Sequence, residues 1–61
     1  MTNFKNKNVA VLGLGIEGRD AINFLLSKGA VVTLLDKKQE SELDFSGIKK
    51  SKIGLVTGKT T

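Results

Sequence analysis

Three glycines stand close together early in the chain, in the stretch Gly13-Leu14-Gly15-Ile16-Glu17-Gly18, which matches the pattern G-x-G-x-x-G. Between a strand and a helix, the first glycine of this pattern permits a tight turn. The second leaves bare backbone for a phosphate, and the third lets the helix approach the strand closely. The pattern predicts that main-chain N–H groups bind a phosphorylated ligand. A glycine-rich turn that serves packing alone is the alternative.

The start of the expected helix lacks a capping side chain. Free N–H groups and a partial positive charge mark a helix N-terminus, and many helices satisfy these groups with Ser, Thr, Asp or Asn. The cap positions here, Gly15 and Ile16, offer no side-chain acceptor. The donors are therefore left for a ligand, and phosphate is the natural candidate. Glu17 suits the helix dipole, but its carboxylate must point outward if a phosphate binds.

A second group of polar residues follows the next apolar run. Asp36 stands eighteen positions after Gly18, where dinucleotide enzymes carry an acidic residue that accepts hydrogen bonds from a ribose. Asp is also a common turn residue at the end of a strand. Lys37 and Lys38 follow at once and either reach a nucleotide or face solvent. The residues alone leave both pairs of alternatives open.

The apolar pattern supplies the elements that position these groups. Apolar runs predict strands over residues 9–12, 30–35 and 52–56, and helical periodicity predicts a helix over residues 16–28. Its apolar face carries Gly18, Ile22, Leu25 and Gly29, and the last of these marks its end. Strand, helix and strand in this order predict a right-handed βαβ unit. The expected fold class is α/β, a partial Rossmann-like unit with a three-stranded parallel sheet.

The remaining segments carry weaker signals. In the polar stretch before the third strand, residues 41–45 predict a short helix, with Ser41 and Asp44 at the spacing of a capping box. The continuous apolar runs are typical of strands buried on both faces. Two helical segments cover one face of such a sheet poorly and leave both edges open, so we expect the chain to be a piece of a longer protein or to self-associate.

Composition excludes several kinds of site. The chain has 61 residues, enough for one small domain, and it has no Cys and no His, so disulfides and a conventional zinc site are excluded. Its net charge of +4 comes from scattered lysines and one arginine, and the absence of Trp and Tyr leaves no stacking platform for nucleic acid. We see no signal peptide and no apolar run long enough to cross a membrane. The sequence predicts a cytoplasmic protein.

The end of the chain, "GLVTGKTT", imitates an ATP-binding P-loop. Three residues separate Gly54 from Gly58, however, where the P-loop has four, and no helix follows. We therefore interpret Thr57 and Gly58 as the turn after the third strand.

At this point the residues resemble a known family. The segments "NKNVAVLGLGIEG" and "FLLSKGAVVTLLD", and more loosely "LVTGKTT", are similar to the N-terminal domain of the muramyl ligases. The likeness is greatest to the branch that adds D-glutamate to UDP-N-acetylmuramoyl-L-alanine, and it covers more than half of the chain. This chain departs from the family at Asn6, where a Gly often stands, and at Glu17, where a small hydroxyl residue is more frequent.

The resemblance implies a role for each part of the site. In that family the N-terminal domain is Rossmann-like and holds the UDP portion of the substrate instead of NAD. The glycine stretch meets the diphosphate, and the end of the second strand flanks the uridine. Carried over, this gives backbone contacts to phosphate from Leu14, Gly15, Ile16 and Glu17, structural roles for Gly13 and Gly18, and contacts to uracil and ribose from Asp36, Lys37 and Lys38.

The family also implies what this chain lacks. Its members are three-domain enzymes in which ATP phosphorylates the substrate carboxylate, with Mg²⁺, before an amine attacks to form an amide. We expect residues 1–61 to be one N-terminal domain that binds a UDP-linked sugar, with no catalytic residue, metal or cofactor of its own. An NAD(P)-binding module of a dehydrogenase or redox-sensing regulator is the alternative, because Asp36 suits NAD and Lys37 and Lys38 suit a 2′-phosphate. A third possibility is an association domain without catalysis.

Overall fold

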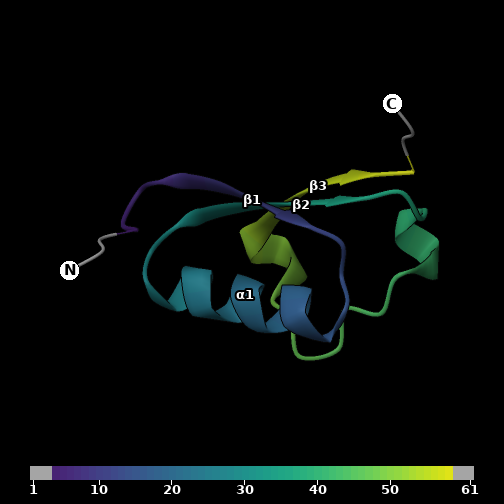
Figure 1. Cartoon of the computed structure of the whole chain (residues 1–61), viewed down its shortest axis with the longest axis horizontal. Helices are drawn as coiled ribbons and strands as arrows, with labels where there is room; N and C mark the ends of the chain where they lie inside the picture. Colours follow the sequence, from purple (N-terminus) through teal and green to yellow (C-terminus); the bar gives the residue numbers. More distant parts are fainter. Residues whose placement is uncertain (1–3, 59–61) are drawn as a thin grey trace.

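The computed structural model describes residues 4–58. In chain order these contain β1 (Asn8–Leu12), α1 (Ile16–Ser27), β2 (Val31–Asp36), the short 3₁₀ helices η1 (Glu40–Glu42) and η2 (Lys50–Lys52), and β3 (Ile53–Thr57). The strands form one parallel sheet in the order β1-β2-β3, with β2 in the centre (Figure 1). The expected α/β class and βαβ unit are confirmed, with strand boundaries shifted by about one residue.

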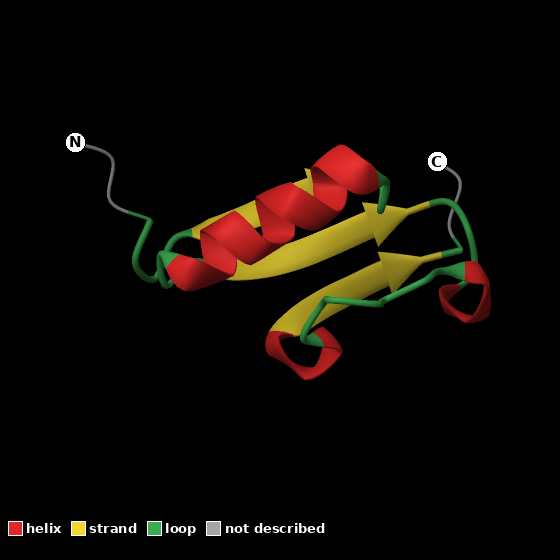
Figure 2. Cartoon of the chain, turned by 90° about the horizontal axis from the view of Figure 1, so that it is seen from below, coloured by secondary structure: helices red, strands yellow, loops and turns green. Residues whose placement is uncertain are grey.

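Within residues 4–58, all of the helices lie on one face of the sheet (Figure 1). Figure 1 shows α1 and both 3₁₀ helices on the same side of the three strands, and Figure 2, seen from that side, shows α1 in front of the sheet. Side chains alternate across a strand, so Val32 is buried under α1 whereas its neighbour Val31 is 52% exposed on the other side. Leu12 of β1 is 79% exposed. The prediction of strands buried on both faces is therefore wrong for this chain, because nothing described here covers the second face.

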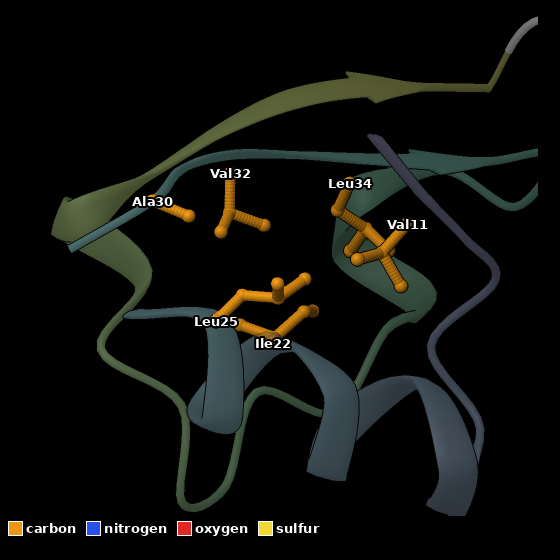
Figure 3. Packing of buried hydrophobic residues seen from close by; sticks show 6 residues of the cluster. All are labelled: Val11, Ile22, Leu25, Ala30, Val32 and Leu34. Carbon is orange, nitrogen blue, oxygen red and sulfur yellow. The ribbon is translucent and has the colours of Figure 1, made fainter. Parts of the chain in front are cut away.

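The hydrophobic core lies between the sheet and α1 (Figure 3). Val32 and Leu34 of β2 are almost completely buried against Ile22 of α1. These positions agree with the apolar helix face expected from sequence, which carries Ile22 and Leu25 into the sheet. The buried cluster consists of Val11, Ile22, Leu25, Ala30, Val32 and Leu34.

The C-terminal end of α1 fixes how the chain enters β2. Gly29 has φ of +82°, and its N–H donates to the Leu26 carbonyl at 3.1 Å, while the Ala30 N–H donates to the Leu25 carbonyl at 3.0 Å. These two bonds form a Schellman motif, in which glycine adopts the left-handed conformation without a steric penalty. Ala30 and Leu25 both belong to the buried core, so the end of the helix also leads directly into the central strand.

The connection from β2 to β3 differs from its prediction. Instead of a helix over residues 41–45, the chain forms η1, whose capping box joins Gln39 and Glu42 rather than Ser41 and Asp44. The carboxylate of Asp44 accepts hydrogen bonds from the N–H and the hydroxyl of Ser46. Such local bonds from an Asp side chain compete with helix formation and favour a turn. The short helix η2 has no counterpart in the prediction.

Candidate functional site

Residues 13–15 connect β1 to α1 and form the glycine bend. Gly13 has φ of +84°, a conformation that L-residues with a side chain rarely adopt. Its N–H donates to the Leu35 carbonyl at 2.8 Å, which continues the pairing of β1 with β2 by one residue. The chain then leaves the sheet at its carboxyl edge, where ligands bind in open α/β folds.

Gly18 brings the first turn of α1 against this bend. A Cβ atom added at Gly18 would overlap the carbonyl oxygen of Gly13 and lie 3.7 Å from the Val11 side chain. The helix and the end of β1 are therefore closer than any other residue type allows without movement of the backbone.

Gly15 is different, because the chain itself leaves room for a side chain there. It is the N-cap of α1 with φ of −94° and ψ of −168°, makes no side-chain cap, and a Cβ added to it would meet nothing within 4 Å. The first helical bond runs from the Arg19 N–H to the Gly15 carbonyl at 2.9 Å. Among residues 4–58, no acceptor satisfies the N–H groups of Ile16, Glu17 and Gly18. We call this uncapped start of α1, residues 15–18, the helix mouth. It is open, and its N–H groups are free to donate to a ligand.

The first two residues of α1 have exposed side chains at the helix mouth. Ile16 is 82% exposed, and Glu17 is an exposed carboxylate in the first turn of the helix. A carboxylate in the first turn complements the helix dipole. Exposure leaves the Glu17 side chain free to stay in solvent while its N–H belongs to the uncapped turn.

Asp36, the last residue of β2, is bonded to the bend. One oxygen of its carboxylate accepts the Leu14 N–H at 3.0 Å, and the other accepts the Lys38 N–H at 2.9 Å. The Lys38 N–H, and then the Leu14 N–H, hold the pKa of Asp36 below its ordinary value, because hydrogen bonds to the carboxylate favour its charged form. The Leu14 N–H thus points to Asp36, unlike the open donors that follow it.

A cleft of about 680 Å³ opens beside Asp36 at the carboxyl ends of the strands. Leu12, Leu35 and Val56 form one row across the sheet, since Leu12 pairs with Leu35 and Leu35 with Val56. This row makes the apolar part of the cleft. The full lining is Leu12, Gly13, Leu35, Asp36, Lys37, Lys38 and Val56.

The structure thus divides the predicted site residues into two adjoining groups. Asp36, Lys37 and Lys38 line the cleft, whereas the predicted phosphate contacts at residues 14–17 lie at the bend and the helix mouth beyond Gly13. Sequence reasoning missed Leu12, Leu35 and Val56 as part of the site. Their signal was available, because each lies within one or two residues of the end of its strand, where a sheet meets its ligand.

Other kinds of site are not seen in the part of the chain that the structure describes. Residues 4–58 hold no group of three Asp, Glu, His or Cys side chains placed to bind a metal ion. No helix in the same range is long and apolar enough to cross a membrane. The "GLVTGKTT" segment places Gly54 inside β3 and Gly58 directly after it, and residues 59–61 lie outside the described range. Thr57 is the last residue of β3 rather than part of a turn, which corrects that expectation.

Comparison with known proteins gives a consistent result. No protein-family model matches the chain. The UDP-N-acetylmuramoylalanine–D-glutamate ligase of Clostridium botulinum strain Hall is 42% identical over 57 residues, which cover 90% of this chain and 12% of that protein. The ligase of the same name from Clostridium tetani is 51% identical over 39 residues, 64% of this chain and 8% of that protein. The resemblance to the muramyl ligases is confirmed, and the chain spans about an eighth of the length of these relatives.

Proposed function

From the premise of homology to UDP-N-acetylmuramoylalanine–D-glutamate ligases, we propose that this chain holds the UDP portion of a nucleotide-linked sugar substrate. The parent activity in this proposal is the ATP-dependent addition of D-glutamate to UDP-N-acetylmuramoyl-L-alanine in peptidoglycan synthesis, in the cytoplasm. The observation that carries the proposal is the uncapped start of α1, which faces open space at Gly15 and adjoins the cleft beside Asp36.

The diphosphate lies at the helix mouth in this proposal. The N–H groups of Gly15, Ile16 and Glu17 supply hydrogen bonds, and the helix dipole favours the negative charge. A side chain at Gly15 would stand between these donors and the phosphate, which accounts for a glycine where the fold itself does not require one. Leu14 adjoins the diphosphate but contributes no donor, because its N–H already bonds to Asp36.

The uridine occupies the cleft. Its volume of about 680 Å³ is within the range of small-molecule sites, which combine apolar walls with a few polar groups. The row formed by Leu12, Leu35 and Val56 packs against the base, and Lys37 and Lys38 add positive charge near the diphosphate. Asp36 lines the cleft and accepts the Leu14 N–H, and so connects the cleft to the glycine bend before α1.

The chemistry of the ligase belongs to other parts of the parent enzyme in this proposal. ATP and Mg²⁺ would activate the substrate carboxylate for attack by the amine of D-glutamate, as the family resemblance implies. Residues 1–61 then act as one N-terminal Rossmann-like domain of a longer protein that binds substrate and positions it. They supply no catalytic side chain, cofactor or metal ligand to the reaction.

A titration of the chain with UDP, and in parallel with NADH, tests this function. We expect UDP to bind and to shift the amide NMR signals of residues 15–17 together with those of Lys37 and Lys38. Binding of NADH without UDP would overturn the proposal in favour of a dinucleotide module. Binding of neither would favour a glycine bend that serves packing alone.

A further inference from the structure

We propose that the Asp36 carboxylate is a positioning residue that holds the glycine bend against the end of β2, and so determines where the free N–H groups of α1 lie. The inference rests on the proposed function for the identity of the ligand, but not for the contact itself. It assigns Asp36 an effect on the diphosphate end of the site through Leu14, in addition to its place beside the uridine.

The geometry of the bend carries this inference. Two long-range hydrogen bonds tie residues 13–15 to β2, one from the Gly13 N–H to the Leu35 carbonyl and one from the Leu14 N–H to Asp36. The first belongs to the main-chain pairing of the sheet and does not involve the side chain at position 36. The second depends on one carboxylate, and Leu14 directly precedes the N-cap Gly15. Loss of the second bond leaves the residue next to the phosphate donors without its anchor.

A carboxylate is suited to this position because both of its oxygens are used. One oxygen accepts from Leu14 on the bend, and the other accepts from Lys38 on the turn that follows β2. An amide at position 36 offers one acceptor oxygen, and its NH₂ group would face one of the two N–H donors. Asn is therefore nearly equal in size to Asp but cannot make both contacts.

The surroundings keep the carboxylate charged. The charged side chains that line the cleft with Asp36 are Lys37 and Lys38, and Lys38 lowers the pKa of Asp36 further by its positive charge. Gly58, at the end of β3, donates its N–H to the main-chain carbonyls of Asp36 and Lys38. The turn that carries the carboxylate is thus itself held by the third strand.

The test compares the wild-type chain with Asp36→Asn, and with Asp44→Asn as the matched control. Asp44 also accepts hydrogen bonds from a following turn, but its partner is Ser46, two residues away, and it has no bond to the bend. Two readouts are used: hydrogen exchange of the Leu14 amide, and the dissociation constant for UDP. In the wild type, the chemical shift of the Leu14 amide is also followed from neutral to acid pH.

We expect the wild-type Leu14 amide to be protected and its shift to titrate with the Asp36 carboxyl. Asp36→Asn should abolish the protection while Gly13 stays protected, and should weaken UDP binding about tenfold, the effect of losing a hydrogen bond to a charged group. Asp44→Asn should change neither. An unchanged Leu14 amide in Asp36→Asn, or lost protection with unchanged UDP affinity, would overturn the inference. A wild-type chain that does not bind UDP would overturn the proposed function, while the Leu14 readouts would still decide whether Asp36 holds the bend.

Discussion

Gly18, in the first turn of α1, packs directly against the carbonyl oxygen of Gly13, the first residue after β1. The absence of a side chain at Gly18 sets the distance between the helix and the sheet. The same contact allows the first turn of α1, with its free N–H groups, to lie close to the end of β1. Gly18 therefore acts on the candidate site indirectly, through the packing of α1 against the end of β1.

Substitution of Gly18 by Ala should destabilise the chain. The added methyl group overlaps a backbone oxygen that cannot rotate away, so α1 must shift, and overpacking of this kind costs about 1–3 kcal/mol. Urea denaturation followed by circular dichroism measures the free energy of unfolding. Gly15→Ala is the matched control, since its methyl group meets nothing within 4 Å and its φ suits any residue. Equal stability of the two variants would contradict the packing role of Gly18.

Gly15→Val should separate folding from binding. The extended backbone of Gly15 tolerates a β-branched residue and the side chain enters open space, so the loss of stability should be limited to the poorer N-cap preference of Val, about 1 kcal/mol or less. UDP affinity should fall by at least about a hundredfold, because the isopropyl group covers the N–H groups that we propose as phosphate donors, an estimate for losing two hydrogen bonds to a charged group. Calorimetric titration gives the affinity. Unchanged affinity would remove the bend from the nucleotide site.

The sequence alone predicted those features of the fold that depend on residue type at one position or on periodic spacing. The burial of Ile22 and Leu25 and the helix stop at Gly29 followed from spacing and residue type, and the structure confirms them. The short helix over residues 41–45 was wrong because Asp44 bonds to its own turn at Ser46. The spacing of residue types does not show whether Asp44 bonds to Ser46 or takes part in a capping box with Ser41.

Contacts between segments that are distant in the sequence could not be predicted either. The bond from the Leu14 N–H to Asp36 joins residues 22 positions apart, and a pattern of residue types does not state which donor a carboxylate takes. Likewise, the row of Leu12, Leu35 and Val56 exists because the strand register aligns these three positions. Register is a property of the assembled sheet, so the sequence placed each of these residues near the end of a strand but did not show that the three lie in one row.

Ile22→Ala should unfold much of the chain. Ile22 is fully buried between α1 and the sheet, and removal of a large buried aliphatic group costs about 2–5 kcal/mol, a large share of the stability of a 61-residue chain. Ile16→Ala is the control on the same helix, because Ile16 is 82% exposed and its loss should change the free energy of unfolding by about 0.5 kcal/mol or less. Thermal denaturation of both variants gives the melting temperatures to be compared. Similar melting temperatures would mean that the core around Ile22 does not stabilise the fold.

The uncovered face and the two edge strands lead to a prediction about association. β1 and β3 each pair with β2 on one side, and the open face exposes Val31 together with Leu12 and Val56, which also line the cleft. Open sheet edges and apolar surface favour pairing with further chain. We expect sedimentation at micromolar concentration to show the isolated chain as a mixture of monomer and larger species. A stable monomer across that range would contradict the expectation.

Acid should weaken the fold through Asp36 and Asp44. Hydrogen bonds from N–H groups lower the pKa of Asp36, and those from Ser46 lower the pKa of Asp44, so each folded-state pKa lies below its value in the unfolded chain. A lowered carboxyl pKa contributes stability above the unfolded pKa, and this contribution disappears as the pH falls through the folded pKa. The free energy of unfolding should therefore decrease between about pH 5 and pH 2.

The two carboxylates are separated by substitution in this experiment. Asp36→Asn and Asp44→Asn should each show a shallower decrease in stability over the same pH range than the wild-type chain, because each lacks one titrating group. Urea denaturation at several pH values measures the slopes. If the slope of Asp36→Asn equalled that of the wild type, the contacts from Leu14 and Lys38 would not favour the charged carboxylate, and the anchor of the glycine bend would lose its physical basis.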